Sequence, residues 1–309
     1  MSPKITMTHE QHKINFIFEQ NKVKKISIDS SASFELLSED TALSRCLNEF
    51  KHLVGLDRIK DFFYELYAWL EINKQREAMG LVVDPQVLHM VFTGNPGTGK
   101  TTIARIASKF FKDMGILEKG HLIEVDRADL VGEYIGHTAQ KTKELINKAI
   151  GGVLFIDEAY ALSRGGEKDF GKEAIDTLVK AMEDRRSEFI LILAGYTHEM
   201  NSFLNANSGI SSRLPNQLLF PDFSVDELIA ITENMINKRD YTISDKASVD
   251  LRNYLQDQKL NYNPNLGNAI FIRNLVEKAI RKQSIRMLSI QNLTREELMT
   301  LRQEDFQLE

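Results

Sequence analysis

The sequence predicts an α/β fold in which helices flank a parallel sheet, with a small all-helical domain after it and a short N-terminal β-hairpin segment before it. Three observations support this prediction. Short apolar segments alternate with helical patterns between residues 87 and 193. A glycine-rich turn joins the first apolar segment to the first of these helices. After Pro221, helical patterns follow one another without a strong strand between them. Alternating strands and helices are typical of a doubly wound parallel sheet.

Residues 1–42 are expected to form an N-terminal segment with a hairpin and a linker. Apolar residues alternate loosely from Lys13 to Ile28, which is typical of a small β-hairpin. The stretch from Ser30 to Asp40 is rich in serine and acidic residues, which is typical of a linker. From Leu43 to Glu77 the apolar residues recur at helical spacing, so we expect two helices on either side of Gly55.

The main domain is expected to span residues 43–222 and the helical domain residues 223–309. The expected strands are Val87–Phe92, His121–Val125, Val153–Ile156 and Phe189–Leu193. The helices expected after the first three strands are Lys100–Lys112, Ala139–Ile150 and Lys172–Asp184. The helices expected in the second domain are Asp226–Lys238, Asp245–Asp257 and Asn268–Met287. The apolar and helical periodicities carry these assignments.

Composition excludes several classes of protein. The hydrophobic fraction is 42% and the net charge is −5, so no long-range attraction for nucleic acid is expected, and no basic stripe is visible. The single cysteine, Cys46, cannot form an intrachain disulfide. No apolar run reaches the length of a membrane-spanning helix, and residues 1–20 lack the pattern of a secretory signal. We therefore expect a cytoplasmic protein without a membrane segment.

A phosphate-binding motif follows the first expected strand. It reads Gly94, Asn95, Pro96, Gly97, Thr98, Gly99, Lys100, Thr101, and Thr102 follows it. Its glycines let backbone N–H groups point toward phosphate oxygens, and the helix that begins at the motif adds its positive end. We expect ATP here, with Lys100 on the β- and γ-phosphates and the Thr101 hydroxyl on Mg²⁺. A turn without chemical consequence is disfavoured, because both motif and flanking elements agree.

Two acids follow the third expected strand. Val153–Ile156 is apolar throughout, which suits a strand buried on both faces, and Asp157 and Glu158 come directly after it. Ligands of open α/β sheets bind at the carboxyl ends of the strands. Asp157 is expected to hold Mg²⁺, and Glu158 is expected to polarise the attacking water. Alone, such a pair is often only a polar turn; together with the phosphate-binding motif it favours hydrolysis over passive binding.

These motifs, in this order and spacing, resemble those of the AAA+ ATPases. The resemblance extends from about Leu53 to Leu288 and covers the first fifty residues only loosely. Beyond the two motifs it is carried by residues 128–139, 155–160 and 165–178. The resemblance implies an ATP-binding domain with a helical lid, Mg²⁺-dependent hydrolysis, and a homo-oligomeric ring, hexameric in this family, that threads or remodels a protein substrate.

The resemblance also assigns residues to the nucleotide. Val54 and Gly55 match the segment that lines the adenine pocket, although a helix-breaking turn explains them almost as well. Tyr196 stands where the family places a polar sensor of the γ-phosphate, but many relatives have asparagine there. Arg213 matches the arginine finger that reaches a neighbouring subunit's γ-phosphate; a solvated surface arginine is the alternative.

A pore loop is the fourth assignment that the resemblance implies. Tyr134, Ile135 and Gly136 match its aromatic–hydrophobic–glycine pattern. An exposed aromatic side chain can grip a polypeptide by apolar contact, without regard to its sequence. The alternative is a tyrosine buried in the core. The two interpretations differ in the exposure that they predict for the ring.

One position departs from the family pattern. The relatives carry a sensor arginine where this chain has Ile270, and Arg273 lies one helical turn further on. The relatives have an arginine at the position of Arg273 as well, so it is not an obvious substitute. Two functions therefore stay open, an ATP-driven remodelling motor and a slower nucleotide-gated switch or scaffold. Ile270 favours the switch, and Glu158 favours the motor.

Overall fold

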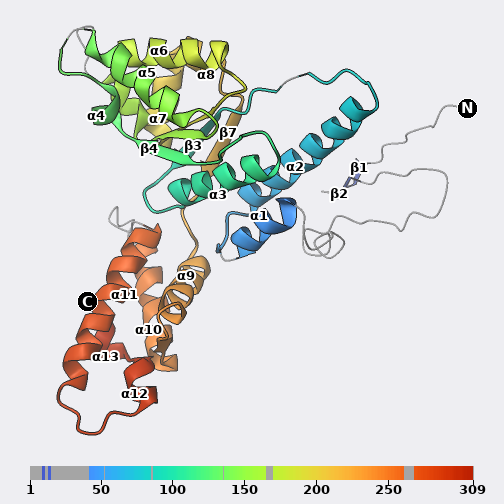
Figure 1. The fold of residues 1–309 in the computed structure, drawn as a ribbon. Helices are drawn as coiled ribbons and strands as arrows, with labels where there is room; N and C mark the ends of the chain where they lie inside the picture. Colours follow the sequence, from blue (N-terminus) through green and yellow to red (C-terminus); the bar gives the residue numbers. More distant parts are fainter. Residues whose placement is uncertain are drawn as a thin grey trace, which may run out of the picture.

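The computed structural model describes residues 9–10, 13–14, 42–51, 53–84, 86–134, 136–164, 170–260 and 268–308. Two bodies are visible in Figure 1, a helix-flanked sheet and a separate helical domain below it. The chain passes once from the first to the second, between the last strand of the sheet, β7, and the first helix of the helical domain, α9. The predicted combination of α/β and all-helical parts is thus confirmed.

The sheet has five parallel strands in the order β4-β5-β6-β3-β7. They are β3 (Met90–Gly94), β4 (Leu122–Val125), β5 (Val153–Ile156), β6 (Ile190–Gly195) and β7 (Asn216–Phe220). Their register brings the carboxyl ends of neighbouring strands together. Thr93 lies opposite Gly195, and Gly94 lies opposite Phe220. This edge of the sheet is therefore where loops from several strands meet, as ligand sites in such sheets require.

Helices cover both faces of the sheet (Figure 1). One face carries α1 (Ala42–Lys51), α2 (Asp57–Ala78) and α3 (Lys100–Asp113), and the other carries α5 (His137–Ala149), α6 (Gly171–Asp184) and α7 (Thr197–Ala206). Side chains along a strand alternate between these two cores. Phe92 and Phe155 lie in the core with α3, whereas Val91 and Leu154 lie in the core with α5 and α6. Burial on both faces explains why the strands are continuous apolar runs.

Several elements were not expected from the sequence. The strand β7 is an addition to the four predicted strands, and β3 begins at Met90 rather than at Val87. Short helices also fill the connections: α4 (Arg127–Leu130), η2 (Ala159–Ser163) and α8 (Ser208–Ser211). At the N-terminus, β1 (His9–Glu10) pairs antiparallel with β2 (Lys13–Ile14). The hairpin was predicted over Lys13–Ile28, and all of this range after Ile14 lies outside the described residues.

The helical domain contains the three predicted helices and a C-terminal extension. The elements are α9 (Val225–Asn237), β8 (Thr242–Ile243), α10 (Asp245–Leu260), α11 (Asn268–Met287), α12 (Arg295–Met299), β9 (Thr300–Leu301) and α13 (Gln303–Phe306). A capping box begins α9, with the Ser224 hydroxyl accepting from the Glu227 N–H and the Glu227 carboxylate accepting from the Ser224 N–H. In the ranges described above, neither domain has a helix long and apolar enough to cross a membrane.

A buried ion pair fastens the C-terminal extension to α11. The Arg286 guanidinium donates to both carboxylate oxygens of Asp305, at 3.0 and 2.7 Å. The Asp305 side chain is only 2% exposed, and the pairing raises the pKa of Arg286 further above its already high value. On the same helix, Gln283 donates to the carbonyl oxygen of Leu298 at 2.8 Å. Polar contacts therefore hold this part of the domain in place beside its apolar core.

Candidate active site

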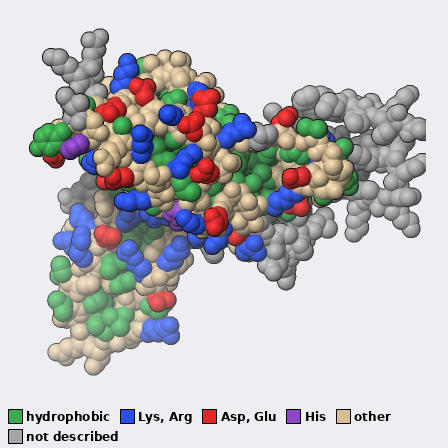
Figure 2. All heavy atoms as spheres, turned by 45° about the horizontal axis from the view of Figure 1, so that its top comes forward, with side chains coloured by type: hydrophobic (Ala, Val, Ile, Leu, Met, Phe, Trp, Pro, Cys, Tyr) green, Lys and Arg blue, Asp and Glu red, His purple; other side chains and the backbone are tan. Residues whose placement is uncertain are grey.

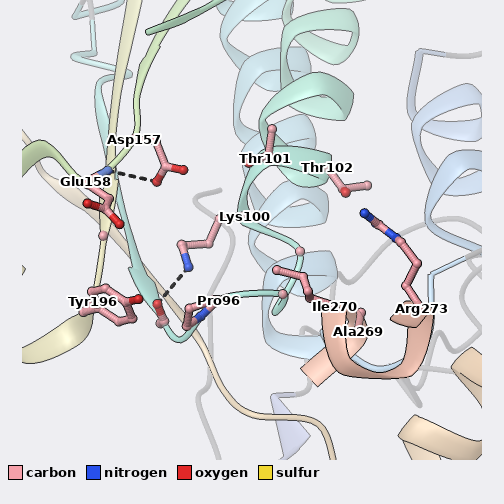
Figure 3. Close-up of a pocket in the computed structure, with 14 residues that line it drawn as sticks. Pro96, Lys100, Thr101, Thr102, Asp157, Glu158, Tyr196, Ala269, Ile270 and Arg273 are labelled. Carbon is pink, nitrogen blue, oxygen red and sulfur yellow. Dashed lines mark hydrogen bonds between the residues drawn. The ribbon is translucent and has the colours of Figure 1, made fainter. Parts of the chain in front are cut away.

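A cavity of about 310 Å³ lies at the carboxyl ends of the strands, where the two domains meet. Figure 3 shows side chains from both domains around it. It is lined by Gly94, Pro96, Gly97, Gly99, Lys100, Thr101, Thr102, Asp157, Glu158, Gly195, Tyr196, Ala269, Ile270 and Arg273. Both predicted chemical motifs, which are about sixty residues apart in the sequence, thus line one cavity.

The phosphate loop connects β3 to α3 and depends on its glycines. Gly94 has a φ of 152°, and a side chain there would collide with the Phe220 carbonyl oxygen of the neighbouring strand. Gly97 and Gly99 have φ of 75° and 100°, in the region that other residues rarely adopt. The loop therefore bends tightly and leads into α3, whose first residues line the cavity. Such a helix end attracts anions.

Lys100 is held in the loop by two carbonyl oxygens. Its ammonium donates to those of Gly94 and Asn95, each at 2.8 Å. Burial lowers the pKa of Lys100, and the carboxylates of Asp157 and Asp222 partly oppose this shift. An anion bound beside the ammonium would favour its charged form. The lysine is thus a cation directed into a cavity that can receive phosphate.

The two acids follow β5 with a sharp change of backbone direction. Asp157 accepts the N–H of Glu158 at 2.9 Å, and Glu158 has a φ of 46°, which is uncommon outside glycine. Tyr160, which the sequence analysis did not single out, is buried beside them. Its burial raises the pKa of Tyr160 to about 12, and the carboxylate of Glu158 adds to the shift. Tyr160 therefore stays protonated near neutral pH and can orient the carboxylate.

Tyr196 lies in the cavity wall beside Tyr160. The two ring centroids are 6.0 Å apart, and Tyr160 also occupies the space next to Gly195. Tyr196 follows β6 directly and precedes α7, as the predicted position at a strand end requires. Its hydroxyl is a hydrogen-bond donor at the place where the sensor was expected.

Val54 and Gly55 do not line the cavity. They belong to the turn before α2, where Gly55 and Leu56 have φ of 64° and 61°. The turn nevertheless lies close to the nucleotide loop, because a side chain at Gly99 would contact Leu56. On its other side, Gly55 is packed against Glu227 of the helical domain. The segment is a helix-breaking turn next to the phosphate loop, which is compatible with both interpretations made from the sequence.

Arg213 lies away from the cavity of its own chain. It follows α8 and donates to the Gly209 carbonyl oxygen at 2.8 Å and to the Glu183 carboxylate at 2.5 Å. Its side chain is 30% exposed. It therefore does not contribute to the site described above, and it remains available to a molecule that approaches this surface.

Tyr134 is exposed rather than buried. Its relative exposure is 65%, and its ring contacts His137 edge-on with centroids 5.4 Å apart. Gly136, with a φ of 84°, ends the loop and begins α5. The core-tyrosine alternative is wrong, because the ring projects from the loop. Ile135 lies outside the described residues.

The helical domain supplies the remaining wall through the first turns of α11. Ala269 and Ile270 face the loop, and Ile270 is 43% exposed. The side chain of Arg273 points toward Thr102 in Figure 3. The wall opposite the sheet is thus mostly apolar, with one cation.

The site is suited to a nucleoside triphosphate with Mg²⁺. The loop and Lys100 offer donors and a positive charge to phosphate oxygens, and Figure 2 shows Lys and Arg side chains gathered along the junction of the two domains. Hydroxyl and carboxylate oxygens, as in Thr101 and Asp157, are the ligands that Mg²⁺ prefers. These residues would hold the nucleotide and its metal.

The comparisons with known proteins identify the family of the chain. Residues 90–222 match the ATPase family associated with various cellular activities (AAA), and residues 224–309 match an AAA lid domain. The chain therefore belongs to the AAA family of ATPases, as its motifs predicted. Its fold resembles a solved RuvB variant from Thermotoga maritima, with a TM-score of 0.53 and 20% identity, covering 82% of this chain and 67% of that one.

Among curated proteins, the chain is similar to stage V sporulation protein K of Bacillus subtilis. The two are 49% identical over 301 residues, which covers 96% of this chain and 94% of the relative. It is also 43% identical over 281 residues to the chloroplastic ribulose bisphosphate carboxylase/oxygenase activase of Cyanidioschyzon merolae, covering 88% and 91% of the two chains. With CbbX of Cereibacter sphaeroides the identity is 41% over 283 residues, covering 90% of each.

Proposed function

We propose that this AAA protein hydrolyses Mg²⁺-bound ATP within a ring of identical subunits, hexameric as the AAA+ resemblance implies, and uses the energy to thread or remodel a protein substrate. Its family supports ATP hydrolysis in general. The observation that carries the proposal is the separation of Arg213 from its own cavity, which Lys100, Asp157 and Glu158 line together.

Each residue of the cavity has a proposed task. Lys100 binds the β- and γ-phosphates, and Thr101 and Asp157 hold the metal. The metal that they would hold would supply positive charge at the phosphates and so make the γ-phosphorus easier to attack. Glu158 orients a water molecule and accepts its proton as the water attacks. Tyr196 donates a hydrogen bond to the γ-phosphate or the water.

Completion of the site needs a second subunit. A transferring phosphoryl group is stabilised by a cation that approaches it from outside the loop. Arg213 is a surface cation that its own chain does not direct into the cavity, so we assign it to the cavity of a neighbour. Contacts of this head-to-tail kind generate a ring when they close. Glu183, its present partner, would release the guanidinium on assembly.

Contact with the substrate is assigned to the loop that presents Tyr134, together with Ile135 and Gly136. An aromatic ring with 65% exposure on a short loop can contact a polypeptide without requiring a particular sequence. The protein substrate itself is not specified by these residues. The relative named stage V sporulation protein K suggests a role in sporulation, and we propose a cytoplasmic location.

A nucleotide-gated switch or scaffold is the second candidate, because Ile270 lines the cavity. Isoleucine has neither a charge nor a hydrogen-bond donor, so this part of the lid cannot respond to the γ-phosphate as an arginine would. Slow hydrolysis that merely times assembly would follow. The rate of ATP turnover, and its response to a polypeptide, separates the switch from the motor.

The test combines turnover, assembly and substrate release. Wild type and Tyr134→Ala, both with Glu158 intact, are compared by steady-state ATP hydrolysis, by sedimentation with ATP, and by ATP-driven release of a client that was first identified through its capture by Glu158→Gln. A motor requires that Tyr134→Ala keep basal hydrolysis within about twofold and lose work on the client, since Tyr134 is outside the cavity. Equal work by both proteins would contradict the pore-loop assignment. Slow hydrolysis with no response to a client would favour the switch.

A further inference from the structure

Asn268, the first residue of α11, occupies an unusual position. It is buried, with 3% exposure, and its φ is 49°, in the left-handed region. Among residues other than glycine, asparagine is one of the few that adopt this region readily. A buried amide in such a conformation needs partners for both its oxygen and its nitrogen.

The partners of Asn268 lie in two other segments. Its side-chain oxygen accepts the N–H of Phe223 at 2.9 Å. Its nitrogen donates to Asp222 at 2.7 Å and to the Pro96 carbonyl oxygen at 3.4 Å. The next residue, Ala269, donates its backbone N–H to the Gly97 carbonyl oxygen at 3.2 Å. The lid helix therefore contacts the phosphate loop directly.

Asp222 joins the same contacts from the linker between β7 and α9. Its two oxygens accept from the Asn95 side-chain nitrogen at 3.0 and 2.9 Å, and one of them also accepts from Asn268. Asn95 and Asp222 are exposed, whereas Asn268 is buried. Three segments that are far apart in the sequence thus meet in one hydrogen-bonded cluster: the phosphate loop, the interdomain linker and the lid helix.

The cluster is not an ordinary helix cap. A capping side chain satisfies the first N–H groups of its own helix. Here the side-chain oxygen of Asn268 instead accepts the N–H of Phe223 in the linker. The backbone N–H of Ala269 donates to the Gly97 carbonyl oxygen in the phosphate loop. A residue that only began the helix would need neither contact.

We propose that Asn268 and Asp222 are positioning residues that make the orientation of the lid follow the conformation of the phosphate loop. The proposal rests on the proposed binding of ATP to that loop. The carbonyl groups of Pro96 and Gly97 belong to the loop that would enclose the phosphates, and they also hold the lid helix. Any backbone shift on binding phosphate is passed to α11 through the hydrogen bonds to these two carbonyl groups, and through the Asp222 carboxylate, which joins Asn95 to Asn268. This link is independent of the charge that Ile270 lacks.

The test uses Asn268→Gly, which keeps a residue suited to the left-handed backbone and removes the side chain. Asn292→Gly is the matched control, because Asn292 is also in the left-handed region, with a φ of 63°, but is exposed in a loop of the same domain. Affinity for a slowly hydrolysed ATP analogue and hydrogen exchange of α11 are measured with and without that analogue.

The expected result is an affinity about tenfold weaker in Asn268→Gly, the size typical of a lost buried hydrogen bond. In wild type and in Asn292→Gly the analogue should slow exchange in both α3 and the start of α11. In Asn268→Gly it should slow exchange in α3 only. Faster exchange of α11 without analogue, together with an unchanged response to it, would show a merely structural role and overturn the proposal.

A second variant keeps the test decisive if Asn268→Gly does not fold. Asn95→Ala removes an exposed member of the cluster, and it should weaken the analogue's effect on α11 in the same direction. The double variant should be no worse than Asn268→Gly, because both changes interrupt one path. Additive losses would contradict a shared path. If the wild-type chain binds no analogue, the proposed function fails; if it binds and all variants respond equally, only this inference fails.

Discussion

The two walls of the cavity differ in their chemistry. The sheet domain contributes a lysine, two threonines and two acids, and the lid contributes Ala269, Ile270 and Arg273. The sheet wall is built from strand ends and a helix start that the parallel register fixes, whereas the lid wall is the first turns of a single helix. The groups proposed to act on the phosphates are thus on the sheet wall, and the lid wall supplies apolar contact and one cation. Substitutions on the sheet wall should therefore mainly change the rate of ATP hydrolysis, and substitutions on the lid wall should mainly change the affinity for ATP.

The largest expected effects are on the sheet wall. Lys100→Ala should abolish ATP binding, because the phosphates lose their fixed cation. Glu158→Gln should preserve binding and reduce turnover by about 10²–10⁴-fold, the usual worth of a positioned general base. Binding is measured by titration with labelled nucleotide and turnover by phosphate release. Glu118→Gln, an exposed acid of the same domain, is the control. Normal turnover in Glu158→Gln would show that the water-positioning role is wrong.

Arg213→Ala tests whether this arginine acts on the nucleotide of a neighbouring subunit. It should leave ATP binding intact and lower turnover by about 10³-fold, as removal of an arginine finger does. Arg186→Ala, another exposed arginine of the same domain, should have little effect. Mixing Arg213→Ala with Lys100→Ala subunits should restore part of the activity, since one interface then combines an intact arginine with an intact loop. No restoration in a mixture shown to co-assemble would contradict action between subunits.

Asp305→Ala probes the stability of the lid. The change leaves the Arg286 cation without its main partner, and breaking such a buried pair costs about 3–5 kcal/mol. Urea unfolding followed by circular dichroism measures the loss. The control is Glu277→Ala, which removes an exposed pair with Arg239 at 3.7 Å and should cost less than about 1 kcal/mol. Equal losses in both variants would mean that the lid does not depend on its buried pair.

Ile270→Arg tests whether a cation added to the lid wall improves ATP binding or hydrolysis. A charge-assisted hydrogen bond to phosphate should tighten ATP binding or raise turnover by about ten- to a hundredfold. Ile270 is half-exposed and lines the cavity, so arginine should fit without disturbing the lid core. Ile285→Arg, on the same helix and also exposed, is the control. Thermal melts accompany the titrations; lower stability without a gain in affinity or turnover would disprove this interpretation.

Local patterns explain why much of the fold was predictable. The strand Val153–Ile156 and the helix Asn268–Met287 have the predicted bounds, because burial on both faces and helical periodicity mark them clearly. The strand β7 was missed because its residues do not form an apolar run. It begins with the polar residues Asn216 and Gln217, and its Leu219 is exposed at the edge of the sheet.

Some residues of the site could likewise be predicted from sequence motifs, and others could not. Lys100, Asp157 and Glu158 stand in sequence motifs, and each motif could be placed at a strand end before the fold was known. Asn268 and Asp222 could not be found in that way. They are 46 residues apart, and only the folded chain brings them into contact with each other and with Asn95. Tyr160 was not singled out because its relation to Glu158 depends on how the two side chains lie relative to each other, which only the folded chain shows.

The short linker between the domains has a consequence for making chimeras. Phe220 closes the sheet beside Gly94, and only three residues separate it from Ser224, which begins the capping box of α9. A lid exchanged between relatives therefore cannot be joined at an arbitrary point after the sheet. The graft has to keep the length of residues 221–223 and to take Asp222 and Asn268 from the same parent, since these two side chains recognise each other. Compatibility of donor and recipient therefore depends on this pair and on the loop that it contacts.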